Sequence, residues 1–314
     1  MKDQHIIPEA YLKGFYNKNN HFFSLDTNLY SLGKLPSAKK KTAGMVCYKP
    51  HYYTLDITFK QQYPAYEGFD PYFLEKKFHS YEQKFKKIIE LFQNRSLVIN
   101  VNDASMLLYA LFDFKVRNNY FRQNIVSRSY PEVIKKLLNE TLDPPFNLSE
   151  DLTAFKISIE NYKNELFNKL NSADSIRATH IVSLIMPDSL HDRVVSTLLY
   201  HEWAVFTSDH GFFTSDNPGF CLDSADVVHN TKFSEDFFFI FPLTDCCCLV
   251  IKDEKIDLKY YEDMNYKNII YRPAPDDIVK RINNMILKNV NQFIFSSDED
   301  KLNKFSTTIS YTKV

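Results

Sequence analysis

The sequence predicts an α+β fold in which a helical layer packs on a mostly antiparallel β-sheet and a C-terminal helix closes the chain. Apolar residues recur at helical spacing through most of residues 71–200. The pattern changes to short strands and turns after residue 202, and residues 276–295 return to an amphipathic helix. We therefore expect a single domain of two intimate parts, with residues 1–202 mainly helical after a small hairpin region and residues 203–314 β-rich with a final helix.

The N-terminal region is expected to be small and irregular. Residues 5–16 begin with an extended segment before Pro8, and this proline then starts a short helix. Residues 21–25 and 28–32 resemble the two strands of a hairpin, with its turn between them.

Two helices have the clearest periodicity. Residues 71–92 place their apolar side chains on one face, with the carboxylates of Glu75 and Glu82 flanking it. Residues 104–120 follow the candidate capping residues Asn102 and Asp103 and are apolar nearly all round, which is typical of a central helix. Arg117 lies near the end of that helix and needs a partner there.

Prolines and polar residues divide the next part of the chain into further helices. These are expected over residues 131–140, 151–170 and 172–200, with breaks at Asp143-Pro144-Pro145 and at Pro187.

The β-rich part begins with residues 203–220, which predict a β-hairpin and then an abrupt polar stop. Asp209-His210-Gly211 supplies turn residues between two segments rich in aromatic and β-branched side chains. Asp216 and Asn217 follow the second segment, and the next residue, a proline, keeps Asn217 extended. Both polar side chains are therefore expected to project from a sheet edge.

Composition excludes several classes of protein. The chain has 314 residues, 44% of them hydrophobic, but six glycines and no GxGxxG or GxxxxGK[ST] motif, so a glycine-rich phosphate loop is not expected. Its 38 basic and 39 acidic residues give no global attraction to nucleic acid or to an anionic membrane. We interpret the five cysteines as reduced residues of a cytoplasmic protein. No signal-like or membrane-spanning run is present, so no membrane partner is expected.

Several short motifs occur in a distinctive order along the chain. They are His5-Ile-Ile-Pro8-Glu-Ala-Tyr11-Leu12-Lys-Gly-Phe15, the pair Glu75 and Glu82, Arg117, Thr214-Ser215-Asp216-Asn217-Pro218, Phe241-Pro242-Leu243 and Asn284. With this order, from residue 5 to about residue 298, the chain resembles the bacterial "domain of unknown function 4238" family. Lys115 departs from the pattern, which has a glutamine upstream of the helix arginine. The family name states no activity, so the resemblance implies positions of interest and no mechanism.

Five side chains are predicted to share one pocket, namely His5, Glu82, Arg117, Asp216 and Asn217. An imidazole, two carboxylates, a guanidinium and an amide can supply a base, a proton partner, an anion clamp and a hydrogen-bond donor to a transition state. The candidate catalytic residues are His5, Glu82, Asp216 and Asn217, and the candidate substrate-binding residues are Arg117 and Arg122. If a metal is used, Mg²⁺ is the candidate, with Glu82 and Asp216 as its oxygen ligands.

Each of these residues also has a structural alternative. Arg117 can pair with Asp113 one turn earlier, and Glu82 can pair with Lys86 one turn later. Asp216-Asn217-Pro218 can form an Asx-type turn at a strand end.

The leading hypothesis is a hydrolase of phosphodiester bonds in RNA or DNA, a nuclease-like effector of a phage-defence or toxin-type system. Nucleic acid would then contact a local patch made by Arg117, Arg122, Arg128 and Lys39-Lys40-Lys41. The alternative is a non-enzymatic binding module that senses a small anionic ligand or a protein partner. A third reading is a structural network that ties the helical and sheet layers together.

Overall fold

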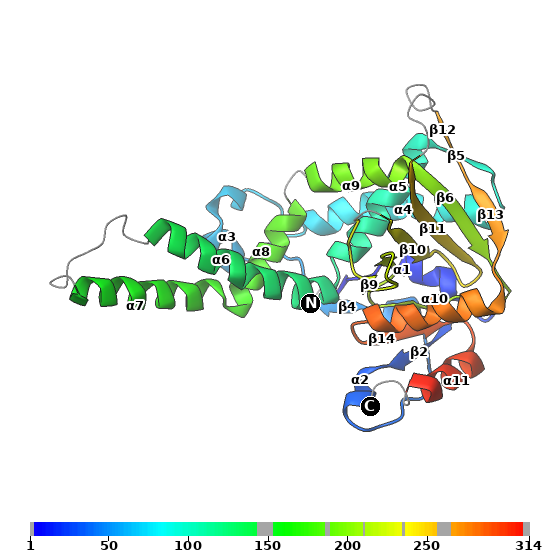
Figure 1. Cartoon of the computed structure of the whole chain (residues 1–314), viewed down its shortest axis with the longest axis horizontal. Coiled ribbons are helices and arrows are strands. Elements are labelled where there is room, and N and C mark those ends of the chain that lie inside the picture. The colour runs from blue at the N-terminus through cyan, green and yellow to red at the C-terminus, as the bar shows by residue number, and fades with distance from the viewer. Residues whose placement is uncertain are drawn as a thin grey trace.

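The computed structural model describes residues 3–142, 153–185, 189–209, 211–233, 236–255 and 265–309; His210, expected in a hairpin turn, lies outside them. The architecture is α+β with mostly antiparallel sheets, as predicted. Figure 1 shows the helices α4 (Phe73–Gln93), α5 (Val101–Val116) and α9 (Ser189–Leu199) beside the largest sheet. The pair α6 (Ser127–Leu142) and α7 (Thr153–Leu170) extends away from it. No helix in the described ranges is long and apolar enough to cross a membrane.

The largest sheet has six strands in the order β13-β6-β11-β10-β8-β9. They are β6 (His201–Thr207), β8 (Phe220–Leu222), β9 (Val228–His229), β10 (Phe238–Pro242), β11 (Cys247–Lys255) and β13 (Ile270–Pro273). The pair β13–β6 is parallel, and the other neighbouring pairs are antiparallel. Side chains alternate along β10, so Phe239 and Phe241 pack in the hydrophobic cluster that contains α5, and Ile240 packs in the cluster that contains α10 (Asp276–Asn289). The sheet is therefore covered on both faces.

A second sheet of four strands joins distant parts of the chain in the order β3-β2-β14-β7. Its strands are β2 (Phe22–Asp26), β3 (Lys39–Lys41), β7 (Thr214–Ser215) and β14 (Phe293–Ser296). Two short ladders complete the β-structure, β1 (Asp3–His5) with β4 (Tyr48–Pro50) and β5 (Val98–Asn100) with β12 (Tyr266–Asn268).

The prediction of a hairpin within residues 203–220 is wrong. Strand β6 pairs with β11 and β13, whereas β7 pairs with β14 in the other sheet. Between them, the backbone N–H of Phe212 donates to the carbonyl of Asp245, so the chain crosses from one sheet to the other. Long-range strand pairing has overridden the local turn residues here.

The hairpin predicted within residues 21–32 is also wrong. Strand β2 forms as expected, but residues Asn28–Ser31 are the short helix α2. Both edges of β2 are taken by other strands, β3 on one side and β14 on the other. The segment after β2 therefore has no free edge on which to pair.

The predicted helices between residues 71 and 200 are present with shifted ends, and the segment 172–200 forms two helices; the predicted breaks, Asp143-Pro144-Pro145 and Pro187, lie outside the described residues. The helices are α4 (Phe73–Gln93), α5 (Val101–Val116), α6 (Ser127–Leu142) after a π-helical turn (Phe121–Val126), α7 (Thr153–Leu170), α8 (Ala173–Ile185) and α9 (Ser189–Leu199). The side chain of Asn100, rather than the expected Asn102 or Asp103, caps α5 by accepting the N–H of Asn102 at 2.8 Å.

The C-terminal segment differs from the single helix expected over residues 276–295. Helix α10 (Asp276–Asn289) ends early, β14 follows it, and a further helix α11 (Glu299–Ile309) closes the described chain. The shorter helical segments are α1 (Glu9–Leu12), η1 (Lys13–Phe15), η2 (Ala43–Met45), α3 (Ile57–Gln62) and η3 (Pro64–Tyr66).

Tyr11 on α1 connects three of the motifs along the sequence. Its buried hydroxyl donates to the carbonyl of Pro242 at 2.8 Å and lies 2.6 Å from Oγ1 of Thr214. Its ring centroid is 5.4 Å from that of Phe114 on α5 and 5.7 Å from that of Phe241 on β10. The N-terminal motif thus packs where the helical layer meets both sheets.

Candidate functional site

A polar pocket of about 390 Å³ opens between β1, the first half of α4 and the end of α5. Its lining residues are Gln4, His5, Tyr53, Glu75, Lys76, Phe78, His79, Glu82 and Arg117. Three of the five side chains predicted to meet, His5, Glu82 and Arg117, therefore do so. Asp216 and Asn217 are not among the lining residues, so the prediction of one five-residue pocket is wrong for these two.

Arg117 is buried at the bottom of this pocket. Its side chain is 1% exposed, and its Nη2 donates to Oε1 of Glu82 at 2.9 Å while its Nε donates to the carbonyl of Ile6 at 3.1 Å. The guanidinium carbon lies 4.5 Å from the centroid of the Phe78 ring, a cation–π contact. Arg117 is thus held on several sides, and it fixes the Glu82 carboxylate at the pocket surface.

The two ion pairs proposed as structural alternatives do not form. Asp113 Oδ1 lies 3.1 Å from Nε2 of His191, so Asp113 is not the partner of Arg117. Nζ of Lys86 lies 3.9 Å from Oε1 of Glu90, so Lys86 is not the partner of Glu82. The Arg117–Glu82 contact joins residues 35 positions apart, beyond the reach of helix spacing rules.

His5 enters the pocket from β1, where it is registered opposite Tyr48 of β4. Its Nε2 lies 3.3 Å from Oε1 of Glu9, within ion-pair distance but outside hydrogen-bond geometry. The imidazole side chain is 27% exposed. Glu9 is therefore the acidic neighbour of the imidazole.

Gln4 and Tyr53 make a rigid wall behind His5. Gln4 is buried, donates through Nε2 to Oγ1 of Thr54 at 3.0 Å and accepts the backbone N–H of Tyr53. The hydroxyl of Tyr53 donates to the carbonyl of Arg117, and burial raises the pKa of that phenol well above its ordinary value. The wall is therefore neutral, and it fixes β1 relative to the end of α5.

Sequence reasoning did not assign His79 or Lys76 to the pocket. Both lie on α4, where Glu75, His79 and Glu82 follow one another at spacings of four and three residues. That spacing places all three on one face of a helix. The signal in the sequence was the helical spacing that places His79 between Glu75 and Glu82 on the same face of α4.

Asp216 holds a turn instead of lining the pocket. Its Oδ1 accepts the backbone N–H groups of Asn291 and Gln292, each at 3.1 Å, and its own N–H donates to the carbonyl of Phe293. These bonds stabilise the turn that joins α10 to β14. Burial raises the pKa of Asp216 to about 6, and the hydrogen bonds from this turn oppose that rise.

The pKa of Asp216 predicts an unusual dependence of stability on pH. The folded state binds this proton more tightly than the unfolded chain, whose ordinary value is 3.8, so the free energy of unfolding contributed by Asp216 falls as pH rises from about 4 to about 6. We expect a fall on the order of 2 kcal/mol. In Asp216→Asn this component should be missing from urea unfolding measured across that range. An unchanged pH profile in Asp216→Asn, matching the exposed control Asp174→Asn, would contradict the assignment.

Asn217 is a buried junction between α5 and α10. Its Oδ1 accepts from Nζ of Lys115 at 2.9 Å and from Nδ2 of Asn118 at 2.7 Å, and its Nδ2 donates to the carbonyl of Asn289 at 2.6 Å. Lys115 is fully buried, and desolvation lowers its pKa well below the ordinary value. The Nζ of Lys115 also donates to the carbonyl of Gly219 at 2.8 Å. The sequence marked Lys115 as unusual but gave no sign of its partners.

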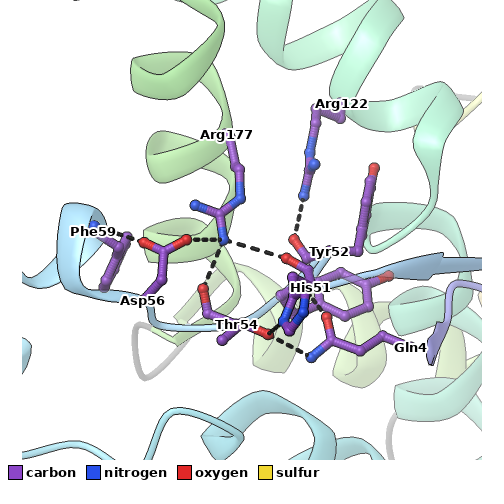
Figure 2. Close-up of polar contacts among 9 residues, drawn as sticks. Gln4, His51, Tyr52, Thr54, Asp56, Phe59, Arg122 and Arg177 are labelled. Carbon is purple, nitrogen blue, oxygen red and sulfur yellow. Dashed lines mark hydrogen bonds and ion pairs between the residues drawn. The ribbon is translucent and has the colours of Figure 1, made fainter. Parts of the chain in front are cut away.

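Arg122 belongs to a different cluster from the pocket. Its Nη2 donates to the carbonyl of Tyr52 at 3.0 Å, its Nε donates to Nδ1 of His180 at 2.8 Å, and its guanidinium carbon lies 3.4 Å from the Tyr52 ring centroid. Figure 2 shows Arg122 and Arg177 reaching the same loop, where Arg177 bonds the carbonyl of Thr54 at 2.7 Å. Burial and Arg122 lower the pKa of His180 to about 3, so this ring is neutral and accepts the bond. Arg122 is thus a structural guanidinium here.

The carboxylates proposed for Mg²⁺ do not form a shared site, because Glu82 lies in the pocket and Asp216 holds the α10–β14 turn. Within the part of the chain that the structure describes, no group of three or more His, Cys, Asp or Glu side chains is arranged to hold a metal ion.

The fold and the pocket define an α+β protein with a histidine and a carboxylate placed beside a buried arginine. The model of a family described as "Protein of unknown function (DUF4238)" matches residues 3–300, nearly the whole chain, and the chain belongs to this family. Searches of curated proteins and of solved structures gave no match.

Proposed function

We propose that the chain is a hydrolase of phosphodiester bonds in nucleic acid and that the pocket around His5 and Glu82 is its active site. The main support is that these two side chains, from β1 and α4, line the same pocket, each beside a group of opposite charge type: Glu9 next to His5 and Arg117 next to Glu82. Such pairs hold a proton acceptor and a carboxylate in defined positions before substrate binds.

In this proposal His5 is the general base. It removes a proton from the attacking water, or from a ribose 2′-hydroxyl, and Glu9 stabilises the resulting imidazolium. Glu82, fixed by Arg117, accepts a hydrogen bond from the same nucleophile and orients it. His79, on the exposed face of α4, returns a proton to the leaving oxygen. Lys76 supplies a positive charge for the phosphoryl oxygens.

The test measures cleavage of a mixed RNA and DNA pool by wild type, His5→Gln and Glu82→Gln, each in EDTA and in Mg²⁺ or Mn²⁺. Both variants should lose cleavage by about 100-fold or more, the range expected when an acid–base group is removed. Glu132→Gln is the matched control, because Glu132 is exposed on α6 and does not line the pocket. Melting temperatures recorded in parallel separate loss of chemistry from loss of folding. A folded wild type that leaves every substrate intact refutes the proposal.

A second candidate is a non-enzymatic module that binds a small anion or a protein partner at the same pocket. Its support is that the pocket lining joins the cationic side chains of Lys76 and Arg117 to the polar side chains of Gln4 and His5, a set that can hold an anion without turnover. Calorimetry that shows ligand binding without cleavage would favour it.

We further propose a cytoplasmic location, which is supported by the five unpaired cysteines. We also propose a phage-defence or toxin-type role, which a plaque assay on expressing cells would test.

A further inference from the structure

A second cavity, of about 360 Å³, lies between α10 and α11 on the side of the molecule that carries the C-terminal helix. Its lining residues are Phe213, Asp276, Val279, Lys280, Asn283, Asn284, Lys301, Lys304, Phe305 and Thr308. On both helices these residues recur every three or four positions, so one face of each helix looks into the cavity. The α11 residues follow residue 300, where the family match ends.

The rim of this cavity is positively charged. Lys280 comes from α10, and Lys301 and Lys304 come from α11. Asp276 is the acidic residue of the lining, and Nζ of Lys301 also lies 3.5 Å from Oδ2 of Asp298. On a chain whose formal net charge is −1, three ammonium groups around one small cavity give a local excess of positive charge.

The floor of the cavity is aromatic and fixed. The rings of Phe213 and Phe305 meet edge to face, with centroids 5.1 Å apart. Phe213 is 3% exposed, and its backbone N–H donates to Oδ1 of Asn283 at 2.8 Å. Asn283 is therefore part of the scaffold. The adjacent Asn284, which the sequence motifs singled out, is exposed and lines the cavity.

We propose that this cavity binds a nucleoside phosphate. The phosphate groups lie against Lys280, Lys301 and Lys304, and the base packs on the ring of Phe305. The amide of Asn284 hydrogen-bonds the edge of the base, and the Asp276 carboxylate accepts a ribose hydroxyl. The cavity volume falls in the range of small-ligand sites, roughly 300–1,000 Å³.

The combination of groups favours this class over simpler anions. Inorganic phosphate or polyphosphate would use the lysines and leave the aromatic floor uncovered. A fatty acid would use one cation and the floor, but it offers nothing to the Asn284 amide or the Asp276 carboxylate. A nucleoside phosphate uses all four kinds of group, since it has a charged end, hydroxyls and a planar ring.

Isothermal titration calorimetry on the full chain tests this site, with ATP, ADP, AMP, tripolyphosphate, adenosine and a short oligonucleotide as separate ligands. We expect ATP or ADP to bind at least about tenfold more tightly than either tripolyphosphate or adenosine, because only the joined molecule uses both halves of the cavity. Repeating the titration with GTP, CTP and UTP reports whether Asn284 selects a base. Tighter binding by tripolyphosphate or by the oligonucleotide would overturn the proposal.

Variants locate the binding. Lys280→Gln combined with Lys304→Gln should weaken ATP binding by about tenfold or more, and Asn284→Ala should weaken nucleotide binding without changing the affinity for tripolyphosphate. All three residues are exposed, so folding should persist. Lys288→Gln is the control, an exposed lysine of α10 outside the cavity. Absence of nucleotide binding up to about 1 mM, or equal binding by the double variant and the control, would also overturn it.

Discussion

Gly219→Ala is expected to destabilise the protein by about 3–5 kcal/mol, because two separate costs coincide at this position. The backbone of Gly219 has φ +68°, a conformation that L residues rarely adopt. A β-carbon built there would overlap Cδ2 of the Phe241 ring and lie 2.8 Å from its Cε2. Phe241 is fully buried and packs against Tyr11, so it has no room to move aside.

Gly33→Ala separates the two costs. Gly33 has the same φ of +68°, but a β-carbon there would meet no atom within 4 Å. Its substitution should cost only the backbone component, about 1–2 kcal/mol. Chemical denaturation of both variants gives the difference, which we assign to the clash with Phe241. Equal losses in the two variants would show that the Phe241 ring yields freely.

Asn217→Ala is expected to cost about 3–5 kcal/mol, which is the second large effect. The substitution removes one of the partners of Asn118 Nδ2, one of the partners of Lys115 Nζ, and the donor to the carbonyl of Asn289. These groups are buried, and each buried polar group left without its partner costs about 1–3 kcal/mol. Lys115 keeps the carbonyl of Gly219, and Asn118 Nδ2 keeps two backbone carbonyls of α5, which limits the total.

Urea unfolding of Asn217→Ala provides the measurement, with Asn102→Ala as the control because Asn102 is exposed on the same helix as Lys115. The same preparations can be assayed for nucleic-acid cleavage. Unchanged stability with loss of cleavage would return Asn217 to the candidate catalytic residues and remove it from the structural network. Lost stability agrees with the buried junction seen here.

The candidate site was predictable only in part. His5, Glu82 and Arg117 stood out in the sequence and line one pocket. The ion-pair partners expected for Arg117 and Glu82 were residues one helical turn away. In the structure these two side chains pair with each other, although they are distant in sequence. Asp216 appeared as a projecting residue because the sequence shows the strand end before it, but not the turn at residues 291–292 that it holds.

The sequence by itself determined the α+β class, the helices between residues 71 and 200 and the family, because helical periodicity and ordered short motifs are local properties of the chain. Only the tertiary structure decided the strand partners, such as β7 with β14, and the use of Asn217 and Arg122 as structural links. The physical reason is that strand edges and buried polar groups are satisfied by whichever segment folding brings within hydrogen-bond distance. In this chain the partners lie far apart in sequence, 102 positions for Lys115 and Asn217 and 267 positions (293 minus 26) for Phe293 and Asp26, where no local pattern records them.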